Sequence, residues 1–192
     1  MSGIQPDSIA FDIDGVVADT MSLFLEIARD RFRITGISKE DITTYMLAEC
    51  LPIPETVIDA IVEELLDMSH WAPLKPIQGS VAVLSRMAEA GAGLTFVTAR
   101  PDGRLIGEWL RAHIPVAPER IKVFATGSFS AKTEVLLSAG KSWFVEDRLE
   151  TCFALNEAGI RPIVFRQPWN RSPHPFLEVG SWEELSECVK RP

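Results

Sequence analysis

Short runs of apolar and β-branched residues recur along the chain. Most of these runs are nearly continuous in apolar residues, a pattern typical of strands that are buried on both faces of a sheet. The pattern predicts five strands, at residues 9–13, 94–98, 121–124, 143–146 and 162–165.

Apolar residues at helical spacing fill the gaps between these runs. They recur from Val81 to Ala88, and Gly91 follows as a plausible helix end. Further helices are predicted at residues 104–112, 132–139 and 151–158, and after a capping box at 181–184. This strand–helix alternation predicts an α/β fold, a three-layer α/β/α Rossmann-like core with a parallel five-stranded sheet.

The stretch between Thr20 and about Pro76 contains no convincing strand. Helical spacing predicts helices at residues 21–32 and 54–68, and Ser38 is predicted to cap a short helix between them. We interpret this stretch as a small α-helical insertion that leaves the core after its first strand. The predicted division is a core of residues 1–20 and 76–192 and a helical cap of residues 21–75.

The composition indicates a globular protein with an acidic surface. The net charge is −8 and the pI is about 4.9, so binding to a nucleic acid polymer is not expected. Three dispersed cysteines without a CxxC pair argue against a disulfide framework or a zinc site. Because no signal-like segment or long apolar run occurs, we expect a cytoplasmic protein that does not span a membrane.

Polar residues follow four of the predicted strands. In an open parallel sheet, ligands bind beyond the carboxyl ends of the strands, and there these residues should meet. They are Asp12 and Asp14, then Thr98, Ala99 and Arg100, then Lys132, and finally Glu146 and Asp147.

These residue types predict phosphoryl transfer assisted by a hard cation. We expect Asp12 to attack phosphorus and form an aspartyl-phosphate, and Asp14 to act as general acid and base. Thr98 and Lys132 are expected to contact phosphoryl oxygens during catalysis, and Lys132 is preferred to Lys122 because it opens the helix after the third strand.

The same set of residues predicts a substrate site and a Mg²⁺ site. Substrate contacts are expected from Thr98, Ala99, Arg100 and Lys132. The expected Mg²⁺ ligands are Asp12, Asp14, Glu146 and Asp147, with Asp147 preferred over Glu146 for direct contact. Arg100 and Arg148 remain open between contact with substrate and an ion-pair or surface role. Trp71 and Trp169 remain open between a base-stacking wall and ordinary packing.

The order of these residues resembles the four motifs of the haloacid dehalogenase superfamily. The motifs are DxDG at 12–15, an apolar strand ending in Thr at 94–98, the isolated Lys132, and an acidic pair at 146–147. The resemblance implies a first-type helical cap and a sheet with the first strand at its centre, between the second and the fourth. Dehalogenase members lack the second acidic residue of the first motif, so Asp14 favours a phosphatase. Glu146 departs from the Gly or Asp that many members have there.

A narrower resemblance concerns residues 165–171 and 146–148, which are similar to the 5′(3′)-deoxyribonucleotidase branch. It implies a Mg²⁺-dependent phosphomonoester hydrolase acting on nucleoside 5′-monophosphates. Two alternatives stay open: a phosphatase for another small phosphorylated metabolite, such as a sugar phosphate or phosphoglycolate, and a non-catalytic binding protein of the same fold. The oligomeric state is open between monomer and homodimer.

Overall fold

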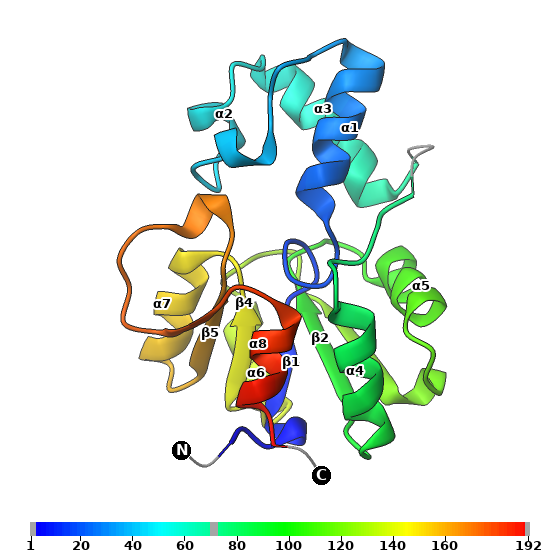
Figure 1. Ribbon diagram of the computed structural model, residues 1–192, viewed down its shortest axis with the longest axis vertical. Coiled ribbons are helices and arrows are strands. Elements are labelled where there is room, and N and C mark those ends of the chain that lie inside the picture. Colours follow the sequence, from blue (N-terminus) through cyan, green and yellow to red (C-terminus); the bar gives the residue numbers. More distant parts are fainter. Residues whose placement is uncertain (1–2, 70–72, 191–192) are drawn as a thin grey trace.

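A parallel sheet forms the centre of the protein (Figure 1). The computed structural model describes residues 3–69 and 73–190, and within them the strand order is β3-β2-β1-β4-β5-β6. This order confirms the expected place of β1 between the second and fourth strands. The strands are β1 Ile9–Phe11, β2 Leu94–Thr98, β3 Ile121–Ala125, β4 Trp143–Glu146, β5 Arg161–Phe165 and β6 Leu177–Val179.

The predicted number of strands was one too small. The sixth strand, β6, pairs in parallel with β5 at the edge of the sheet, where Phe165 lies opposite Val179. Only Val179 of its three residues is buried, so β6 carries no apolar run that sequence analysis could detect. Strand β1 also ends earlier than predicted, at Phe11, because the chain turns directly afterwards.

Helices cover both faces of the sheet and complete the predicted three-layer core. Phe11, Phe96 and Val145 share one hydrophobic core with residues of α4, α5 and α8, while Val97 and Phe144 share a second core with α6 and α7. These helices are α4 Ser80–Glu89, α5 Arg104–His113, α6 Lys132–Ser138, α7 Leu149–Glu157 and α8 Trp182–Cys188. The 3₁₀-helices outside the insertion are η1 Pro6–Ser8, η3 Pro118–Arg120 and η4 Pro168–Asn170.

One detail of the last helix differs from the predicted capping box. The hydroxyl of Ser181 accepts a hydrogen bond from the Glu184 amide, as expected. The Glu184 carboxylate, however, accepts its hydrogen bond from the Gly180 amide instead of that of Ser181. In a standard capping box the Glu184 carboxylate would accept from the Ser181 amide, so this hydrogen bond is shifted by one residue toward the N-terminus.

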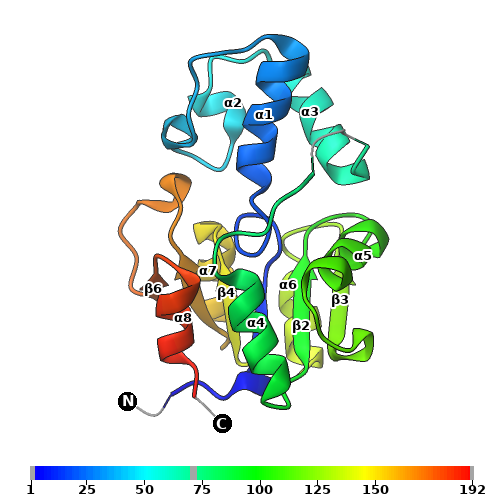
Figure 2. The ribbon, with the colours of Figure 1, turned by 45° about the vertical axis from the view of Figure 1, so that its right-hand side comes forward.

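A helical segment, residues 20–67, stands over the carboxyl ends of the strands (Figures 1 and 2). It contains α1 Thr20–Phe32, η2 Lys39–Asp41, α2 Leu47–Cys50 and α3 Glu55–Asp67, and α1 packs against α3. Ser38 and Asp41 form the capping box of η2. The domain boundaries drawn from the sequence stay a prediction, and Trp71 lies outside the described residues.

Two connecting segments join the helical segment to the sheet and run side by side (Figure 2). Ala18 and Pro76 form an antiparallel bridge. The Asp19 amide donates to the Lys75 carbonyl oxygen at 2.9 Å, and the Ile77 amide donates to the Val17 carbonyl oxygen at 2.7 Å. The chain therefore leaves and re-enters the core at one place.

Candidate active site

A cavity of about 680 Å³ lies between the helical segment and the carboxyl ends of the strands. Its core-side wall includes Asp12, Asp14 and Thr98, and its opposite wall includes Phe24 and Tyr45. The cavity therefore lies at the edge of the sheet where the sequence placed the candidate residues.

The turn after β1 brings the first acidic residues into this cavity. The Ile13 carbonyl oxygen accepts from the Val17 and Ala18 amides, each at 2.8 Å, which closes the turn. Gly15 has φ of 75° and lies so close to Asp147 that a Cβ at this position would be 2.2 Å from Asp147 Oδ2. Only glycine fits both the left-handed backbone and this close approach.

Lys132 connects two of the candidate motifs. Its Nζ lies 2.8 Å from Asp12 Oδ2 and 2.8 Å from Glu146 Oε2, and its side chain is fully buried at the start of α6. Burial disfavours the charged ammonium, but the two carboxylates outweigh this effect and raise the pKa of Lys132 above its usual value. Lys122, the alternative to Lys132 in the sequence analysis, is exposed on β3.

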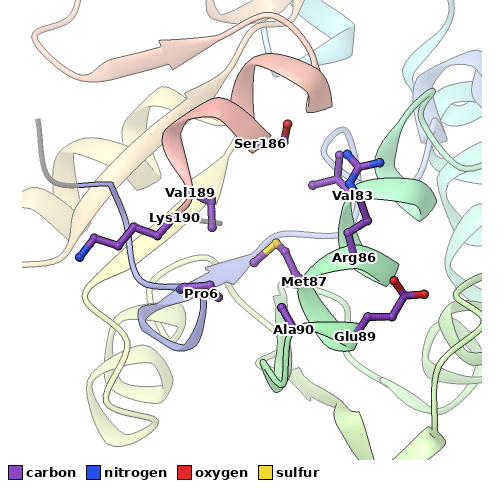
Figure 3. A pocket seen from close by; sticks show the side chains of 9 residues that line it. All are labelled: Pro6, Val83, Arg86, Met87, Glu89, Ala90, Ser186, Val189 and Lys190. Carbon is purple, nitrogen blue, oxygen red and sulfur yellow. The ribbon is translucent and has the colours of Figure 1, made fainter. Parts of the chain in front are cut away.

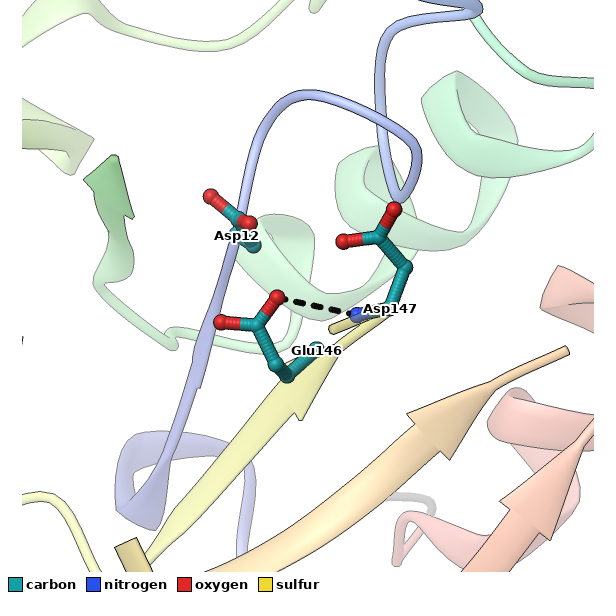
Figure 4. Close-up of side chains that lie close together, drawn as sticks. All are labelled: Asp12, Glu146 and Asp147. Carbon is teal, nitrogen blue, oxygen red and sulfur yellow. Dashed lines mark hydrogen bonds between the residues drawn. The ribbon is translucent and has the colours of Figure 1, made fainter. Parts of the chain in front are cut away.

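Three buried carboxylates lie together (Figure 4). Two of them contact Lys132. Asp12, Glu146 and Asp147 each offer an oxygen within 4.8 Å of the others. Burial, together with the neighbouring Glu146, raises the pKa of both Asp12 and Asp147 well above the ordinary value. A cation at this position would offset the repulsion among these carboxylates, and oxygen ligands of this kind suit Mg²⁺.

The oxygens of Glu146 and Asp147 have different partners. Glu146 Oε1 accepts from the Asp147 and Arg148 amides, while its Oε2 contacts Lys132. Asp147 Oδ2 accepts from the Trp169 indole at 2.9 Å, whereas the buried Oδ1 finds no hydrogen-bond partner among the described residues. This buried, unpartnered oxygen is available to a cation, so the carboxylate set fits one. The choice of Asp147 over Glu146 as direct ligand stays a prediction.

Asp14 lies in the same cavity but apart from the acidic cluster. Its Oδ1 accepts from Thr20 Oγ1 at 2.6 Å and from Arg100 Nη2 at 2.8 Å, and its Oδ2 accepts from Arg100 Nε at 2.9 Å. Burial alone would raise the pKa of Asp14, but the Arg100 guanidinium, together with the Thr20 hydroxyl and the charge of Lys132, outweighs burial and lowers it. Of the four predicted metal-site carboxylates, the structure thus brings three together and pairs the fourth with Arg100.

The residues that follow β2 form the next part of the wall. Thr98 is buried, and its Oγ1 accepts from the Arg100 amide at 3.2 Å. Thr98 and Ala99 line the cavity, in keeping with their predicted place. Arg100 also lines the cavity, and its guanidinium is engaged with Asp14, so the ion-pair role that the sequence left open is present.

Sequence analysis missed the hydrogen bonds that η4 and the preceding residue Gln167 make to the site. Asn170 Nδ2 donates to the Asp147 carbonyl oxygen at 2.8 Å, and Gln167 Nε2 donates to the Gly15 carbonyl oxygen at 2.6 Å. Together with Trp169, these residues hold the acidic strand end and the first turn in place. The sequence feature that could have indicated them is the position of these residues shortly after the end of β5, at the same edge of the sheet.

A comparison with protein families matches residues 7–191 to the model described as 5′ nucleotidase, deoxy (pyrimidine), cytosolic type C protein. The chain belongs to this family. The match spans nearly the whole chain and includes all eight candidate residues. It also confirms the narrower resemblance to the nucleotidase branch of the haloacid dehalogenase superfamily. No curated protein matches the chain in sequence.

Solved structures share the fold of this nucleotidase-family protein at low identity. A predicted phosphoglycolate phosphatase from Haemophilus somnus 129pt is 14% identical with a TM-score of 0.64, covering 96% of this chain and 99% of that chain. CbbY from Rhodobacter sphaeroides in complex with xylulose-1,5-bisphosphate is 18% identical with a TM-score of 0.61, covering 93% and 96%. Protein Tyrosine Kinase A from Mycobacterium tuberculosis is 18% identical with a TM-score of 0.67, covering 96% and 98%. These differing descriptions show why the fold alone does not decide the reaction.

Aromatic side chains enclose the cavity of this nucleotidase-family protein on the side of β3. The rings of Tyr45 and Phe129 pack edge to face, with their centroids 5.5 Å apart. This contact connects the helical segment to the loop after β3. The Arg148 guanidinium carbon lies 4.3 Å from the Phe129 ring centroid and 5.2 Å from that of Tyr45. Burial, with added repulsion from nearby carboxylates, raises the pKa of Tyr45 well above its usual value.

A second cavity, of about 730 Å³, lies at the amino ends of the strands between α4 and α8 (Figure 3). Val83 and Met87 of α4 and Val189 after α8 give it apolar walls, and Arg86 lies at its rim. It is slightly larger than the first cavity but contains none of the candidate residues.

No helix in residues 3–69 and 73–190 has the length and apolar character needed to cross a membrane.

Proposed function

We propose that this protein is a Mg²⁺-dependent phosphomonoester hydrolase that acts through an aspartyl-phosphate on Asp12, with nucleoside 5′-monophosphates as substrates. The observation that carries the proposal is the meeting of Asp12, Lys132, Glu146 and Asp147 beside one cavity. An intact set of this kind argues against the alternative of a non-catalytic binding protein.

The surroundings of Asp12 suit a nucleophile. Its Oδ1 accepts from the Ile13 amide at 2.8 Å and its Oδ2 contacts Lys132, so the carboxylate is held in one orientation. Attack by Asp12 forms a bond to phosphorus and breaks the ester bond to the leaving oxygen. Lys132 and the Thr98 hydroxyl are placed to stabilise charge on the phosphoryl oxygens.

Asp14 is the proposed general acid and base. It donates a proton to the leaving oxygen, which departs as an alcohol, and its carboxylate then takes a proton from the water that attacks the aspartyl-phosphate. This second step releases phosphate and restores Asp12. Bound Mg²⁺ would be held by Asp12 and Asp147, with Glu146 behind them, and would neutralise charge on the transferring group.

The proposed substrate class rests on the family and on the walls of the cavity. Phe24, Tyr45 and Phe129 line the cavity and offer apolar or aromatic surface to a nucleobase. We further propose that the helical segment is a cap that closes over the bound nucleotide and excludes water. The rival substrate, another small phosphorylated metabolite, would use the same catalytic residues.

The test is phosphate release from a panel of nucleoside monophosphates, sugar phosphates and phosphoglycolate. Wild type and Asp12→Asn are compared with Mg²⁺ and with EDTA, and circular dichroism checks that both are folded. We expect release that requires both Mg²⁺ and Asp12 and is fastest on nucleotides. Faster release from a sugar phosphate would replace the substrate proposal, and equal activity of Asp12→Asn would disprove the nucleophile.

A further inference from the structure

One oxygen of the acidic cluster differs from the others. Both oxygens of Asp12 and both of Glu146 have partners, and so does Asp147 Oδ2. Asp147 Oδ1 is buried and has no partner in the part of the chain that the structure describes. Because buried polar atoms in proteins are nearly always satisfied, Oδ1 is the oxygen that we expect a cation to contact.

The indole of Trp169 holds the other oxygen of the same carboxylate. The Trp169 side chain is buried, and its Nε1 donates to Asp147 Oδ2 at 2.9 Å. This Oδ2 atom lies against Gly15, where an added Cβ would be 2.2 Å away. Figure 4 shows one oxygen of Asp147 directed toward the loop after β1 and the other toward Asp12. The carboxylate is therefore held on the side of Gly15 and left free on the side of the cluster.

The indole is itself fixed by the residues on either side of it. The Gln167 amide donates to Asn170 Oδ1 at 2.9 Å, which closes the short turn that carries Trp169. Asn170 Nδ2 donates to the Asp147 carbonyl oxygen at 2.8 Å, and Gln167 Nε2 donates to the Gly15 carbonyl oxygen at 2.6 Å. The backbone and the side chain of Asp147 are thus held from one short segment.

Trp169 is absent from the described residues that line the cavity beside the acidic cluster. This placement argues against the base-stacking role that the sequence left open for it. The feature that Trp169 presents to the site is the N–H group of its indole.

The number of oxygens that a carboxylate offers distinguishes Mg²⁺ from Ca²⁺. Mg²⁺ demands short bonds in a near-octahedral arrangement, whereas Ca²⁺ accepts about six to eight oxygens in flexible geometry and often takes both oxygens of one carboxylate. Because Trp169 occupies Oδ2, Asp147 offers Oδ1 alone. Without the indole donor, the carboxylate could turn and offer both oxygens to one cation.

We propose that Trp169 is a positioning residue that fixes Asp147 for binding through Oδ1 alone and thereby favours Mg²⁺ over Ca²⁺. This inference rests on the cation site of the proposed function. Trp169 acts on the cation only through Asp147. Hydrogen-bond partners of this kind orient the ligands of a metal ion and restrain them before it binds.

The first test measures the affinity of Trp169→Phe for each cation in the absence of substrate. Phenylalanine keeps an aromatic ring but lacks the N–H donor. The melting temperature as a function of Mg²⁺ or Ca²⁺ concentration gives an apparent Kd for each cation. We expect the Kd for Mg²⁺ to rise by about 10- to 100-fold, and the Kd for Ca²⁺ to change by only a few fold.

Trp109→Phe is the matched control. Trp109 is 8% exposed where Trp169 is 7% exposed, and its indole also donates at 2.9 Å, but to the carbonyl oxygen of Leu74. This variant should lose stability in EDTA as Trp169→Phe does, while its affinities for both cations stay those of wild type. An equal weakening of Mg²⁺ and Ca²⁺ binding in Trp169→Phe would overturn the proposal, and so would unchanged Mg²⁺ binding.

A second measurement uses wild type and keeps the proposal testable if Trp169→Phe does not fold. In protein labelled with ¹⁵N, the indole N–H signals of the tryptophans are assigned through the backbone by NMR. The Trp169 signal should shift on addition of Mg²⁺, because its proton lies on the carboxylate that binds the cation. The Trp109 signal should stay in place. A Trp169 signal that does not move at saturating Mg²⁺ would overturn the proposal.

These outcomes separate the inference from the proposed function. If wild type binds Mg²⁺ but releases no phosphate from any ester, the proposed hydrolase activity fails, and the cation affinities still decide the role of Trp169. If wild type releases phosphate and Trp169→Phe keeps the cation preference of wild type, the inference alone fails. Wild type that binds neither cation would overturn both.

Discussion

The Lys132 ammonium lies 2.8 Å from Oδ2 of Asp12, in a fully buried position. The same nitrogen lies 2.8 Å from Glu146 Oε2, and Asp147 belongs to the same carboxylate cluster. One buried cation therefore offsets charge on several buried carboxylates. This relationship makes Lys132 important for folding as well as for the proposed chemistry.

Lys132→Met should strongly destabilise the protein when Mg²⁺ is removed. The change leaves buried carboxylates without their partner, which typically costs about 3–5 kcal/mol. Urea unfolding in EDTA measures the free energy of unfolding, and Lys122→Met serves as control because Lys122 is exposed on β3. A loss below about 1 kcal/mol for Lys132→Met would contradict the assigned role.

Mg²⁺ should raise the melting temperature of wild type. A ligand at about 100 times its Kd stabilises the folded state by about 2.7 kcal/mol, which corresponds to several degrees. Asp147→Asn should reduce this shift, because the unpartnered Oδ1 is then part of a neutral amide. Glu119→Gln, a change on the exposed side of η3, should keep the full shift. Identical melting of wild type in Mg²⁺ and EDTA would argue against the cation site.

Gly15→Ala should disturb the acidic cluster from the first turn. The substitution places a Cβ 2.2 Å from Asp147 Oδ2 at a residue with φ of 75°. Gly159→Ala is the matched control, because Gly159 has φ of 84° and nothing within 4 Å of the added carbon. Both variants carry left-handed backbone strain of about 1–2 kcal/mol, but Gly15→Ala should lose more stability and also the Mg²⁺ shift. Equal stability of the two variants would show that the approach to Asp147 is unimportant.

Tyr45 should titrate at higher pH than a tyrosine in water. It is the single tyrosine of the chain, so tyrosinate absorbance near 295 nm reports on it alone. Burial raises its pKa in the folded state, whereas the unfolded value is about 10. Its contribution to stability is therefore fully present below about pH 10 and falls as the pH rises above that value.

The tyrosinate midpoint of native protein should exceed that of protein unfolded in guanidinium. Phe129→Ala should lower the native midpoint, because water then reaches the Tyr45 ring that Phe129 covers. Coincident native and unfolded midpoints would show that Tyr45 is exposed in solution.

Continuous apolar runs made most of the sheet predictable. The bounds of β2 and β4 match the predicted ranges, because both strands are buried along most of their length. Strand β6 could not be predicted in the same way, because it is short and exposed and is defined by its pairing with β5. Strand pairing between segments that are distant in sequence cannot be read from the local pattern of apolar residues.

The candidate site likewise contains residues that the local sequence predicts and contacts that depend on the fold. Asp12, Lys132 and Asp147 were predictable because each stands at the carboxyl end of a strand or at the start of the next helix. The partner of Arg100 was not, because its contact with Asp14 joins residues 86 positions apart and depends on where α3 ends. The support from Trp169 to Asp147 likewise required the path of the chain after β5.

The bridge between Ala18 and Pro76 has a consequence for how this protein can change over evolution. Because the insertion begins and ends at one bridged pair, its length and content can vary without altering the register of β1 and β2. The wall of the cavity that the insertion supplies can therefore diverge quickly, while the acidic cluster on the core side is preserved.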